Sequence, residues 1–216
     1  MARRIRGAAG LFKVGLQLFT AEGPRAVERL AGLGFEIFLD LKFHDIPNTV
    51  AGAVAAAAEL PKVRLINVHT LGGIAMMRAA RETVAGKKRR PALLGVTILT
   101  SMDAAALRRV GISGAPASRV VALARLAKHA GLDGVVASAH EARAIRRACG
   151  PRFLIVVPGV RPASAALNDQ SRVATPGDAI RAGANYLVVG RPVTGASDPR
   201  DAALSIAREM AEAGRG

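Results

Sequence analysis

The sequence predicts an α/β protein with the (β/α)8 barrel fold, folded as one domain over residues 1–216 and lacking its first strand. Short apolar runs alternate with helical runs along the whole chain. The apolar runs consist almost entirely of Val, Ile and Leu, which is typical of parallel strands buried on both faces. Polar residues follow nearly every run, namely Lys13, Asp40 with Lys42, His69, Thr100, Arg161, and Gly190 with Arg191.

These polar residues favour a barrel over the alternative that the alternation also allows, an open doubly wound sheet. A barrel gathers the carboxyl ends of all its strands at one mouth. An open sheet uses only the loops at its switch point. The sequence also has no G-x-G-x-x-G or P-loop motif, so a dinucleotide site has no support.

The expected elements follow from the period of the apolar residues and from Gly and Pro between the runs. In the first half, strands are expected at 11–15, 35–41 and 63–69, and helices at 21–33, 50–60 and 73–85. Asn48 and Thr49 are expected to cap the second of these helices. The basic stretch 87–90 is expected to be a solvated turn.

In the second half, strands are expected at 93–99, 134–137, 153–157 and 186–189, and helices at 118–130, 141–149, shortly after 176, and at 202–213. The segment 158–176 is long, polar and irregular, and a loop of that length is usually functional. The strands number seven, whereas a closed barrel has eight. We therefore expect either that the true start lies upstream of Met1, or that the chain is marginally stable and weakly active.

Composition limits the function classes. The formal net charge is +15, which could serve nucleic-acid binding. The arginines are spread through every helical segment and are not interleaved with aromatic residues, so we expect no nucleic-acid partner. Cys149 is the only cysteine, which suits a cytoplasmic location. No apolar stretch approaches the ~18 residues of a membrane span, and no membrane partner is expected.

The chemistry is concentrated in residues 38–49. Asp40 and Lys42 are two positions apart, so on a strand they point to the same face, and Asp45 follows before Pro47. An ion pair that caps a strand would explain the first two residues. Three charged groups in six residues at the end of a buried strand favour a functional site.

The end of the chain resembles a phosphate site. Gly190 and Arg191 follow the last expected strand, where barrels often bind phosphate with backbone N–H groups at the start of a short helix. An ordinary left-handed turn with a surface arginine fits the same residues equally well. Arg161 and Gln170, in the long preceding loop, favour the phosphate interpretation.

Other sites are weaker candidates. His44 and His69 have no metal-ligand spacing, and His69 is expected to be a hydrogen-bonded residue at a strand end. Ser138 lacks a nucleophile elbow. We expect no metal site.

Six segments together resemble the orotidine 5′-phosphate decarboxylase family, in the family's order, over about residues 11 to 200. They are 13–19 (KVGLQLF), 39–50 (LDLKFHDIPNTV), 96–102 (VTILTSM), 158–162 (PGVRP), 169–170 (DQ) and 189–194 (VGRPVT). The long second segment is highly specific. Its D-x-K-x-x-D core occurs also in related decarboxylases and synthases that act on sugar phosphates.

The resemblance implies decarboxylation of orotidine 5′-phosphate to uridine 5′-phosphate without a cofactor, the last step of pyrimidine nucleotide synthesis. Lys42 would protonate C6, Asp40 would lie beside the substrate carboxylate, and Lys13 would connect Asp40 to the ribose. Asp45, as a catalytic residue, and Thr49 would reach the site of a second subunit in a homodimer, and Ile46 would contact the substrate. Thr100 would contact the pyrimidine, and Arg161, Gln170, Gly190 and Arg191 would bind the phosphate.

The chemistry of the residues agrees with this implication. Decarboxylation at this carbon leaves a carbanion with no adjacent π system, so the site must supply positive charge and a proton. Alternating Lys and Asp residues supply both. Three rival functions stay open: a Mg²⁺-dependent sugar-phosphate decarboxylase or synthase, a catalytically weak truncated form, and an inactive barrel that binds RNA through its charge.

Overall fold

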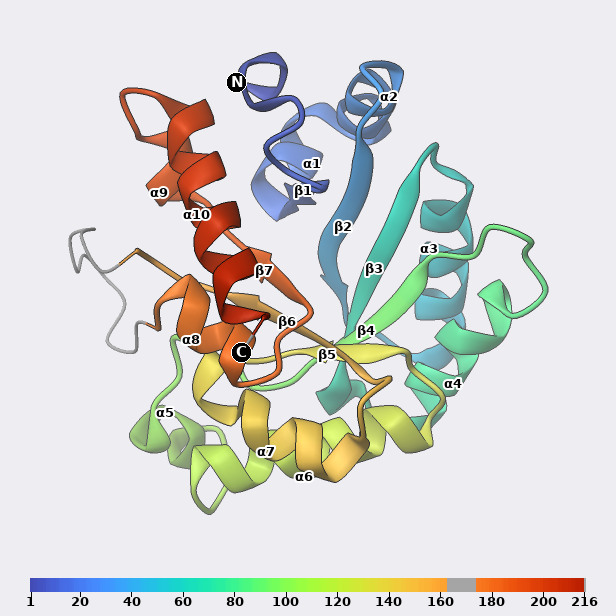
Figure 1. Ribbon diagram of the computed structural model, residues 1–216. Helices are drawn as coiled ribbons and strands as arrows, with labels where there is room; N and C mark the ends of the chain where they lie inside the picture. The colour runs from blue at the N-terminus through green and yellow to red at the C-terminus, as the bar shows by residue number, and fades with distance from the viewer. Residues whose placement is uncertain (163–173, 216) are drawn as a thin grey trace. The chain divides into compact units, whose positions relative to one another are not determined.

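The computed structural model describes residues 1–162 and 174–215. Strands alternate with helices along this part of the chain (Figure 1). The strands are β1 (Leu11–Gly15), β2 (Glu36–Phe43), β3 (Val63–His69), β4 (Ala92–Val96), β5 (Gly134–Val136), β6 (Leu154–Pro158) and β7 (Tyr186–Val188). They form one sheet in chain order, from β1 to β7. The pairs β1–β2, β2–β3, β3–β4 and β6–β7 are parallel, as the predicted fold class requires.

The α-helices connect these strands. They are α1 (Leu16–Glu22), α2 (Pro24–Gly32), α3 (Pro47–Glu59), α4 (Gly73–Val84), α5 (Ala104–Arg109), α6 (Pro116–His129), α7 (Ala139–Cys149), α8 (Pro176–Arg181), α9 (Arg191–Thr194) and α10 (Pro199–Ala213). Two short 3-10 helices, η1 (Ala2–Ile5) and η2 (Thr70–Gly72), complete the described elements. Residues 1–10 contain η1 and no strand, so β1 is the first strand of the described chain, as expected.

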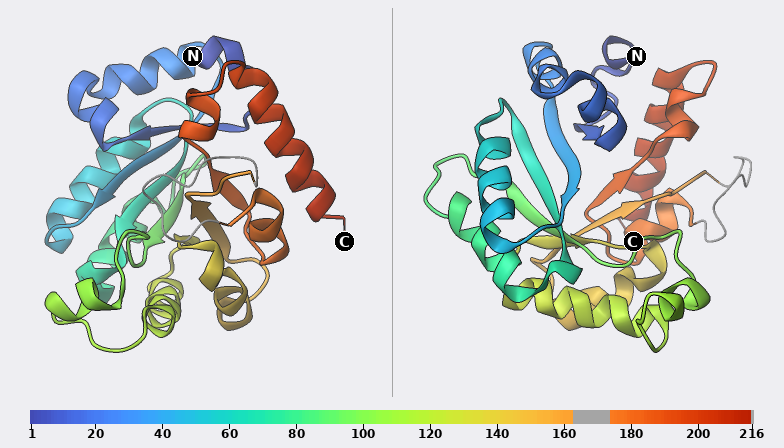
Figure 2. Two further views of the ribbon diagram at one scale, coloured as in Figure 1. Left: turned by 90° about the vertical axis from the view of Figure 1, so that its left-hand side faces the viewer. Right: turned by 180° about the vertical axis from the view of Figure 1, so that it is seen from behind.

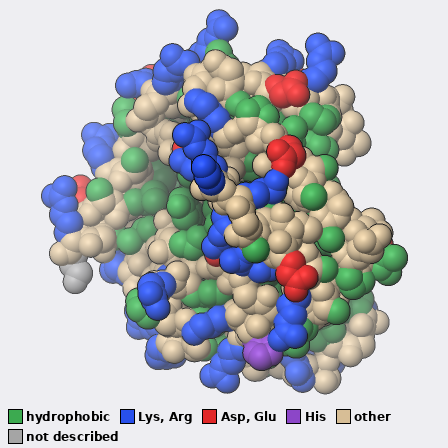
Figure 3. All heavy atoms as spheres, turned by 90° about the vertical axis from the view of Figure 1, so that its right-hand side faces the viewer, with side chains coloured by type: hydrophobic (Ala, Val, Ile, Leu, Met, Phe, Trp, Pro, Cys, Tyr) green, Lys and Arg blue, Asp and Glu red, His purple; other side chains and the backbone are tan. Residues whose placement is uncertain are grey.

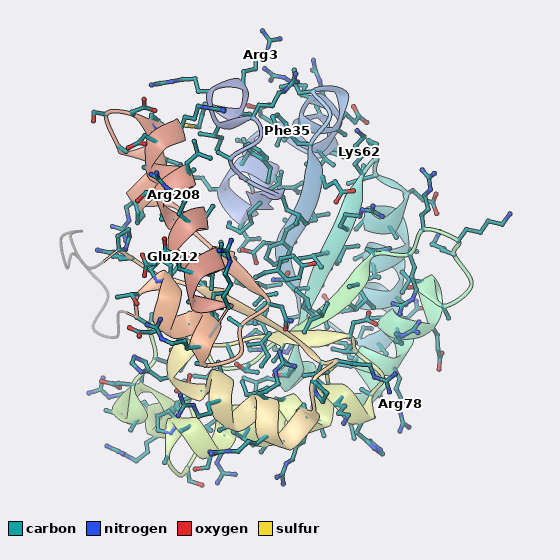
Figure 4. The ribbon with its side chains drawn as sticks, viewed as in Figure 1. Arg3, Phe35, Lys62, Arg78, Arg208 and Glu212 are labelled. Atoms are coloured by element: carbon teal, nitrogen blue, oxygen red, sulfur yellow. The ribbon has the colours of Figure 1, made fainter. Side chains whose placement is uncertain are left out.

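The chain divides into two compact units. That it forms one domain therefore stays a prediction. One unit comprises residues 10–96 and 126–135 and contains β1 to β4. Its core consists of fully buried strand residues such as Val14, Leu39 and Ile66. Phe35, labelled in Figure 4, packs its ring against that of Phe12 at the start of the β1–β2 pair, with centroids 4.2 Å apart and the planes tilted by 41°. Helices α3 and α4 lie side by side in this unit (Figure 1).

The other unit comprises residues 1–9, 97–125 and 136–216. Helix α10 packs against α8, α9 and η1 (Figure 2). Its amino end is capped by Asp198, whose carboxylate accepts hydrogen bonds from the backbone N–H groups of Arg200 and Asp201. The side chain of Arg200 donates to the carbonyl of Arg6, which attaches the start of the chain to α10.

Three element predictions are wrong. The expected helix 21–33 is two helices, because Gly23 has φ +61° and Pro24 begins α2. Asn48 and Thr49 do not cap α3, since Ile46 is the N-cap residue and Pro47 occupies the first helical position. The expected strand 93–99 ends at Val96, and helix α5 beyond it, capped by the Asp103 carboxylate, was not predicted.

The basic stretch 87–90 is also more than a solvated turn. Lys87 pairs with Glu59, and Arg90 makes a bidentate pair with Asp133 at 2.8 Å. The Asp133 carboxylate accepts a further hydrogen bond from the Leu93 N–H. The turn therefore fixes the start of β4 against the residue before β5.

Lys and Arg side chains are distributed over the face shown in Figure 3, with hydrophobic and other residues between them. None of the helices in the described residues has the length and apolarity to span a membrane.

Candidate active site

The end of β2 is a bulge that changes the direction of the chain at the charged residues. Leu39 pairs with Ile66 of β3, and the next aligned pair is Phe43 with Val68. Three residues of β2, 40–42, therefore lie opposite one residue of β3, Asn67. Lys42 adopts a left-handed backbone with φ +51°, which is rare for a residue with a long side chain. Such strain costs ~1–3 kcal/mol and is typically retained where function needs it.

Lys42 from the bulge and Lys13 from the neighbouring β1 both contact the Asp40 carboxylate. The Lys42 ammonium donates to Asp40 Oδ1 at 2.6 Å, and the Lys13 ammonium lies 3.2 Å from Asp40 Oδ2. Asp40 is buried, with 8% of its surface exposed. Lys13 and Lys42 are half-exposed, with 37% and 32% of their side chains accessible. Asp40 and Lys42 do meet, as predicted, but through a bulge and not through the regular alternation of a strand.

The electrostatics of Asp40 follow from these contacts. Burial raises the pKa of the carboxyl group. Hydrogen bonds from Lys42 and Asn67 lower it, and so do the charges of Lys42 and Lys13. The lowering effects win, so the pKa of Asp40 lies below its ordinary value and the residue stays ionised between the two ammonium groups.

Asn67 is the residue of this cluster that sequence reasoning missed. It is fully buried, its Nδ2 donates to Asp40 Oδ1 at 2.7 Å, and its Oδ1 accepts from the Lys42 backbone N–H at 2.8 Å. The available signal was an amide side chain inside the apolar run of β3. A buried amide needs hydrogen-bond partners, and the charged end of the neighbouring strand supplies them.

Asp45, Ile46 and Thr49 lie beyond the bulge, on the connection to α3 and on its first turn. All three are exposed, and Ile46 shows 67% of its surface. The Asp45 carboxylate accepts a hydrogen bond from the Ile46 N–H at 2.6 Å, which holds the connection in a tight turn.

Lys13, Asp40 and Lys42 form a charged cluster, which we call the array. His44 and His69 stack beside this array, with ring centroids 5.2 Å apart. Burial lowers the pKa of His69, and the charges of His44 and Lys42 lower it further. Its Nδ1 accepts from the Leu71 N–H at 3.4 Å, so His69 is a hydrogen-bonded residue at a strand end, as expected. Across residues 1–162 and 174–215, no group of three or more His, Cys, Asp or Glu side chains is placed to hold a metal ion.

The second unit, which comprises residues 1–9, 97–125 and 136–216, contains the predicted pyrimidine and phosphate residues that the structure describes. A pocket in this unit is lined by Thr100, Ser138, Ala139, Pro158, Gly159, Val160 and Ala174. Ser138 caps helix α7, where its Oγ accepts from the His140 N–H, and this is its structural role. Arg161 is 5% exposed, and its backbone N–H donates to the Ala174 carbonyl. Gln170 lies outside the described residues.

Gly190 is the N-cap residue of helix α9, and its carbonyl accepts from the N–H groups of Val193 and Thr194. Its φ of −107° is not left-handed, so the alternative of an ordinary left-handed turn is wrong. Arg191 is exposed and is the first residue of α9. Gly190 and Arg191 thus occupy the start of a short helix after a strand, as the phosphate interpretation requires.

Comparison with known proteins decides the family. Residues 1–206 match the family described as orotidine 5′-phosphate decarboxylase / HUMPS. The chain belongs to this family. A relative from Nitrosococcus oceani, named orotidine 5′-phosphate decarboxylase, is 53% identical over 97% of this chain and 90% of its own length. A relative of the same name from Halorhodospira halophila is 57% identical over 94% of this chain and 85% of its own length.

The family also has solved structures with the same fold. The crystal structure of orotidine 5′-phosphate decarboxylase from Lactobacillus acidophilus superimposes with a TM-score of 0.80. Its sequence is 40% identical, and the match covers 92% of this chain and 85% of that one. The predicted α/β barrel class is therefore confirmed.

Proposed function

We propose that Lys42, Asp40 and Lys13 carry out the decarboxylation that is characteristic of the orotidine 5′-phosphate decarboxylase family. The chain is a carboxy-lyase that converts orotidine 5′-phosphate to uridine 5′-phosphate and carbon dioxide, the last step of pyrimidine nucleotide synthesis. The residue roles are our proposal, and one observation carries it. A buried carboxylate is held between two ammonium groups, 2.6 and 3.2 Å away, at the end of a strand.

The chemistry of the array fits each step. When the carboxylate of the substrate leaves C6, the bonding electrons stay on that carbon as a carbanion. The Lys42 ammonium is the proposed acid: it gives its proton to C6, and its positive charge stabilises the carbanion before transfer. Asp40, placed beside the substrate carboxylate, repels that group and favours its departure. Lys13 balances the Asp40 charge and is proposed to reach the ribose.

The phosphate of the substrate is the proposed ligand of the second unit. Arg191 and the Gly190 backbone at the start of α9 offer a guanidinium and N–H groups to an anion. Arg161 and Gln170 complete the proposed phosphate set, and Thr100 is proposed to contact the pyrimidine. Contact with a phosphate remote from C6 can provide binding energy that orders the reacting groups.

We further propose a homodimer in which Asp45, Ile46 and Thr49 contribute to the partner's site. Exposed apolar side chains follow three neighbouring strands of the same unit, with 55% of Leu16, 67% of Ile46 and 46% of Leu71 accessible. Clustered exposed apolar residues favour a protein interface. The proposed occupant of this surface is a second copy of the chain, with its own Asp45 on the same connection. A cytoplasmic location is proposed from the single cysteine, Cys149, which is free and buried.

The function is tested by the loss of ultraviolet absorbance when orotidine 5′-phosphate is mixed with the purified protein. Loss that persists in excess chelator would exclude the Mg²⁺-dependent sugar-phosphate chemistry as the function. An unchanged spectrum, combined with salt-sensitive RNA binding and no binding of uridine 5′-phosphate, would instead support the RNA-binding alternative.

The Lys42→Ala variant tests the proposed acid. We expect turnover to be nearly abolished, because the variant lacks the ammonium that is proposed to protonate C6. Binding of uridine 5′-phosphate, measured by calorimetry, should be largely retained. Turnover near that of the unmodified chain would remove Lys42 from the acid role.

The Arg191→Ala variant tests the phosphate contact. The kcat/KM for orotidine 5′-phosphate should fall by roughly 100-fold or more, since a bidentate charge-assisted contact is lost. The kcat/KM for the nucleoside orotidine, which has no phosphate, should change little. Equal losses on the two substrates would show that Arg191 supports the fold and does not bind the phosphate.

A further inference from the structure

Asn67 lies at the point where the bulge interrupts the β2–β3 ladder. Between the aligned pairs Leu39–Ile66 and Phe43–Val68, three β2 residues face Asn67. In a regular parallel ladder, alternate backbone N–H groups of β2 would donate to carbonyls of β3. At the bulge, the Lys42 N–H donates instead to the Asn67 side-chain oxygen at 2.8 Å. The amide thus replaces a missing backbone acceptor.

The orientation of this amide follows from its two neighbours. A backbone N–H can only donate and an ionised carboxylate can only accept. The oxygen of Asn67 must therefore face Lys42, and its nitrogen must face Asp40, where it donates to Oδ1 at 2.7 Å. Asp40 Oδ1 is also the acceptor for the Lys42 ammonium at 2.6 Å. One side chain consequently holds both ends of the Lys42–Asp40 pair, through the Lys42 backbone and through the Asp40 carboxylate.

We propose that Asn67 is a positioning residue for the decarboxylation. Its amide keeps Lys42 in the left-handed backbone of the bulge and fixes the Asp40 carboxylate, so that the Lys42 ammonium stays directed at the reacting carbon. The inference rests on the roles proposed above for Lys42 and Asp40. Asn67 touches neither the substrate nor the reacting atoms in this scheme.

The Asn67→Asp variant separates the two contacts of Asn67. Aspartate has nearly the same shape, and its carboxylate still accepts from the Lys42 N–H. It cannot donate to Asp40, however, and it places a second carboxylate against the first. The other charged groups that face Asp40 are Lys13 from β1 and Lys42 from β2. The charges of Lys42 and of His44, on the β2–α3 connection, act in turn on His69 of β3. A like charge raises the pKa of a carboxyl group, so one proton should bind to the pair at a higher pH.

We expect two changes in Asn67→Asp, measured by steady-state kinetics across pH. The kcat should fall by about 10- to 100-fold, as is typical when a group that orients a reactive residue is lost, with a much smaller change in KM. The acidic limb of the kcat/KM profile should move to higher pH, because Asp40 must be ionised to hold Lys42. A residue that only stabilises the fold would lower the melting temperature without moving this limb.

The matched control is Thr70→Val, in the same unit. Thr70 is as fully buried as Asn67, and its hydroxyl donates to the backbone carbonyl of Val96 at 2.8 Å. This variant should lose a buried hydrogen bond and some stability, yet keep the wild-type kcat and acidic limb. Lys42→Ala serves as the reference for the proposed function. If Lys42→Ala stays active, the acid role proposed for Lys42 fails, whatever Asn67 does.

The inference alone is overturned if Lys42→Ala is inactive while Asn67→Asp keeps the wild-type kcat and acidic limb. It is also overturned if Thr70→Val moves the limb by the same amount. Should Asn67→Asp not fold, Asn67→Ala removes both contacts without adding a charge, and its kcat should fall while its KM is retained. A wild-type kcat in that variant would refute the role. If both variants are unfolded while Thr70→Val folds, Asn67 serves folding and the proposal is wrong.

Discussion

The backbone at Gly15 lies close to the Lys13 ammonium, which contacts Asp40. A Cβ atom added at Gly15 would lie 2.6 Å from the Lys13 Nζ, closer than real Cβ contacts allow. Gly15 has φ −99° and ψ 179°, which any residue can adopt. The absence of a side chain at this position therefore serves the lysine and not the backbone conformation. The nearby atom is the end of a flexible side chain, so a substitution would move Lys13 and leave the strand in place.

We therefore expect Gly15→Ala to displace the Lys13 ammonium from Asp40 without changing any charge. A displacement of about 1 Å can cost up to roughly 100-fold in rate, so we expect kcat to fall by about 10- to 100-fold. The melting temperature should change little. Gly10→Ala is the control, because a Cβ at Gly10 meets no atom within 4 Å. Wild-type turnover in Gly15→Ala would mean that the position of Lys13 does not limit catalysis.

Arg146 of α7 connects its helix with the segments that precede β6 and β7. It therefore lies at the amino ends of strands, whereas the proposed site residues lie at the carboxyl ends. Its guanidinium donates to the carbonyls of Gly150, Pro151 and Phe153, which precede β6. It also donates to the Gly183 carbonyl and to Asn185 Oδ1, at 2.7 Å each, before β7. Burial lowers the pKa of Arg146, although the group stays charged at neutral pH. Residues at the amino ends of barrel strands typically serve stability, whereas the carboxyl ends carry the chemistry.

Arg146→Lys should thus lower stability and spare activity. A lysine has one nitrogen and at most three hydrogen bonds, so several of these carbonyls lose their donor. We expect the free energy of unfolding to fall by about 2–4 kcal/mol in urea denaturation, with kcat unchanged at a temperature where the variant is folded. Arg143→Lys, at an exposed position of the same helix, is the control and should change neither quantity. A loss of kcat in folded Arg146→Lys would contradict the separation of the two strand ends.

The elements differ in how far the sequence could predict them. Strand β3 has the predicted bounds, because its apolar run ends in polar residues at both sides. The division between α1 and α2 depends on a left-handed glycine followed by proline, a signal that the sequence does carry at Gly23 and Pro24. The bulge of β2 carries no local signal. It arises from the register of two strands that are distant in sequence, and so the role of Asn67 emerged only from the structure.

At the scale of the whole molecule, the proposed site residues fall into the two compact units. Asp40, Lys42, Lys13 and the connection with Asp45 belong to one unit, and Thr100, Arg161, Gly190 and Arg191 belong to the other. The motifs predicted both groups, since each residue lies in the middle or second half of a strand or shortly after one. Assembly could not be predicted in the same way, because an interface depends on exposed surface. The surface that we propose for it includes the exposed Leu16, Ile46 and Leu71, which follow β1, β2 and β3.

The proposed homodimer with shared sites leads to a prediction about mixed assemblies. Inactive Lys42→Ala and Asp45→Ala chains, unfolded and refolded together, should regain activity. In a mixed dimer, one site combines the intact Lys42 of one chain with the intact Asp45 of the other. With random pairing, half of the dimers are mixed and half of their sites are intact, so about a quarter of the wild-type turnover should return.

The control is a mixture of Lys42→Ala with Lys13→Ala chains. Both lysines belong to the same array, so each site of a mixed dimer lacks one of them and no activity should return. Two affinity tags of different kinds, one on each chain, allow the mixed dimers to be purified and counted before the assay. If purified mixed dimers of the Lys42→Ala and Asp45→Ala chains stay inactive, each site is built from one chain. In that case the partner's site does not use Asp45, and the exposure of the connection at Asp45 and Ile46 must have another explanation.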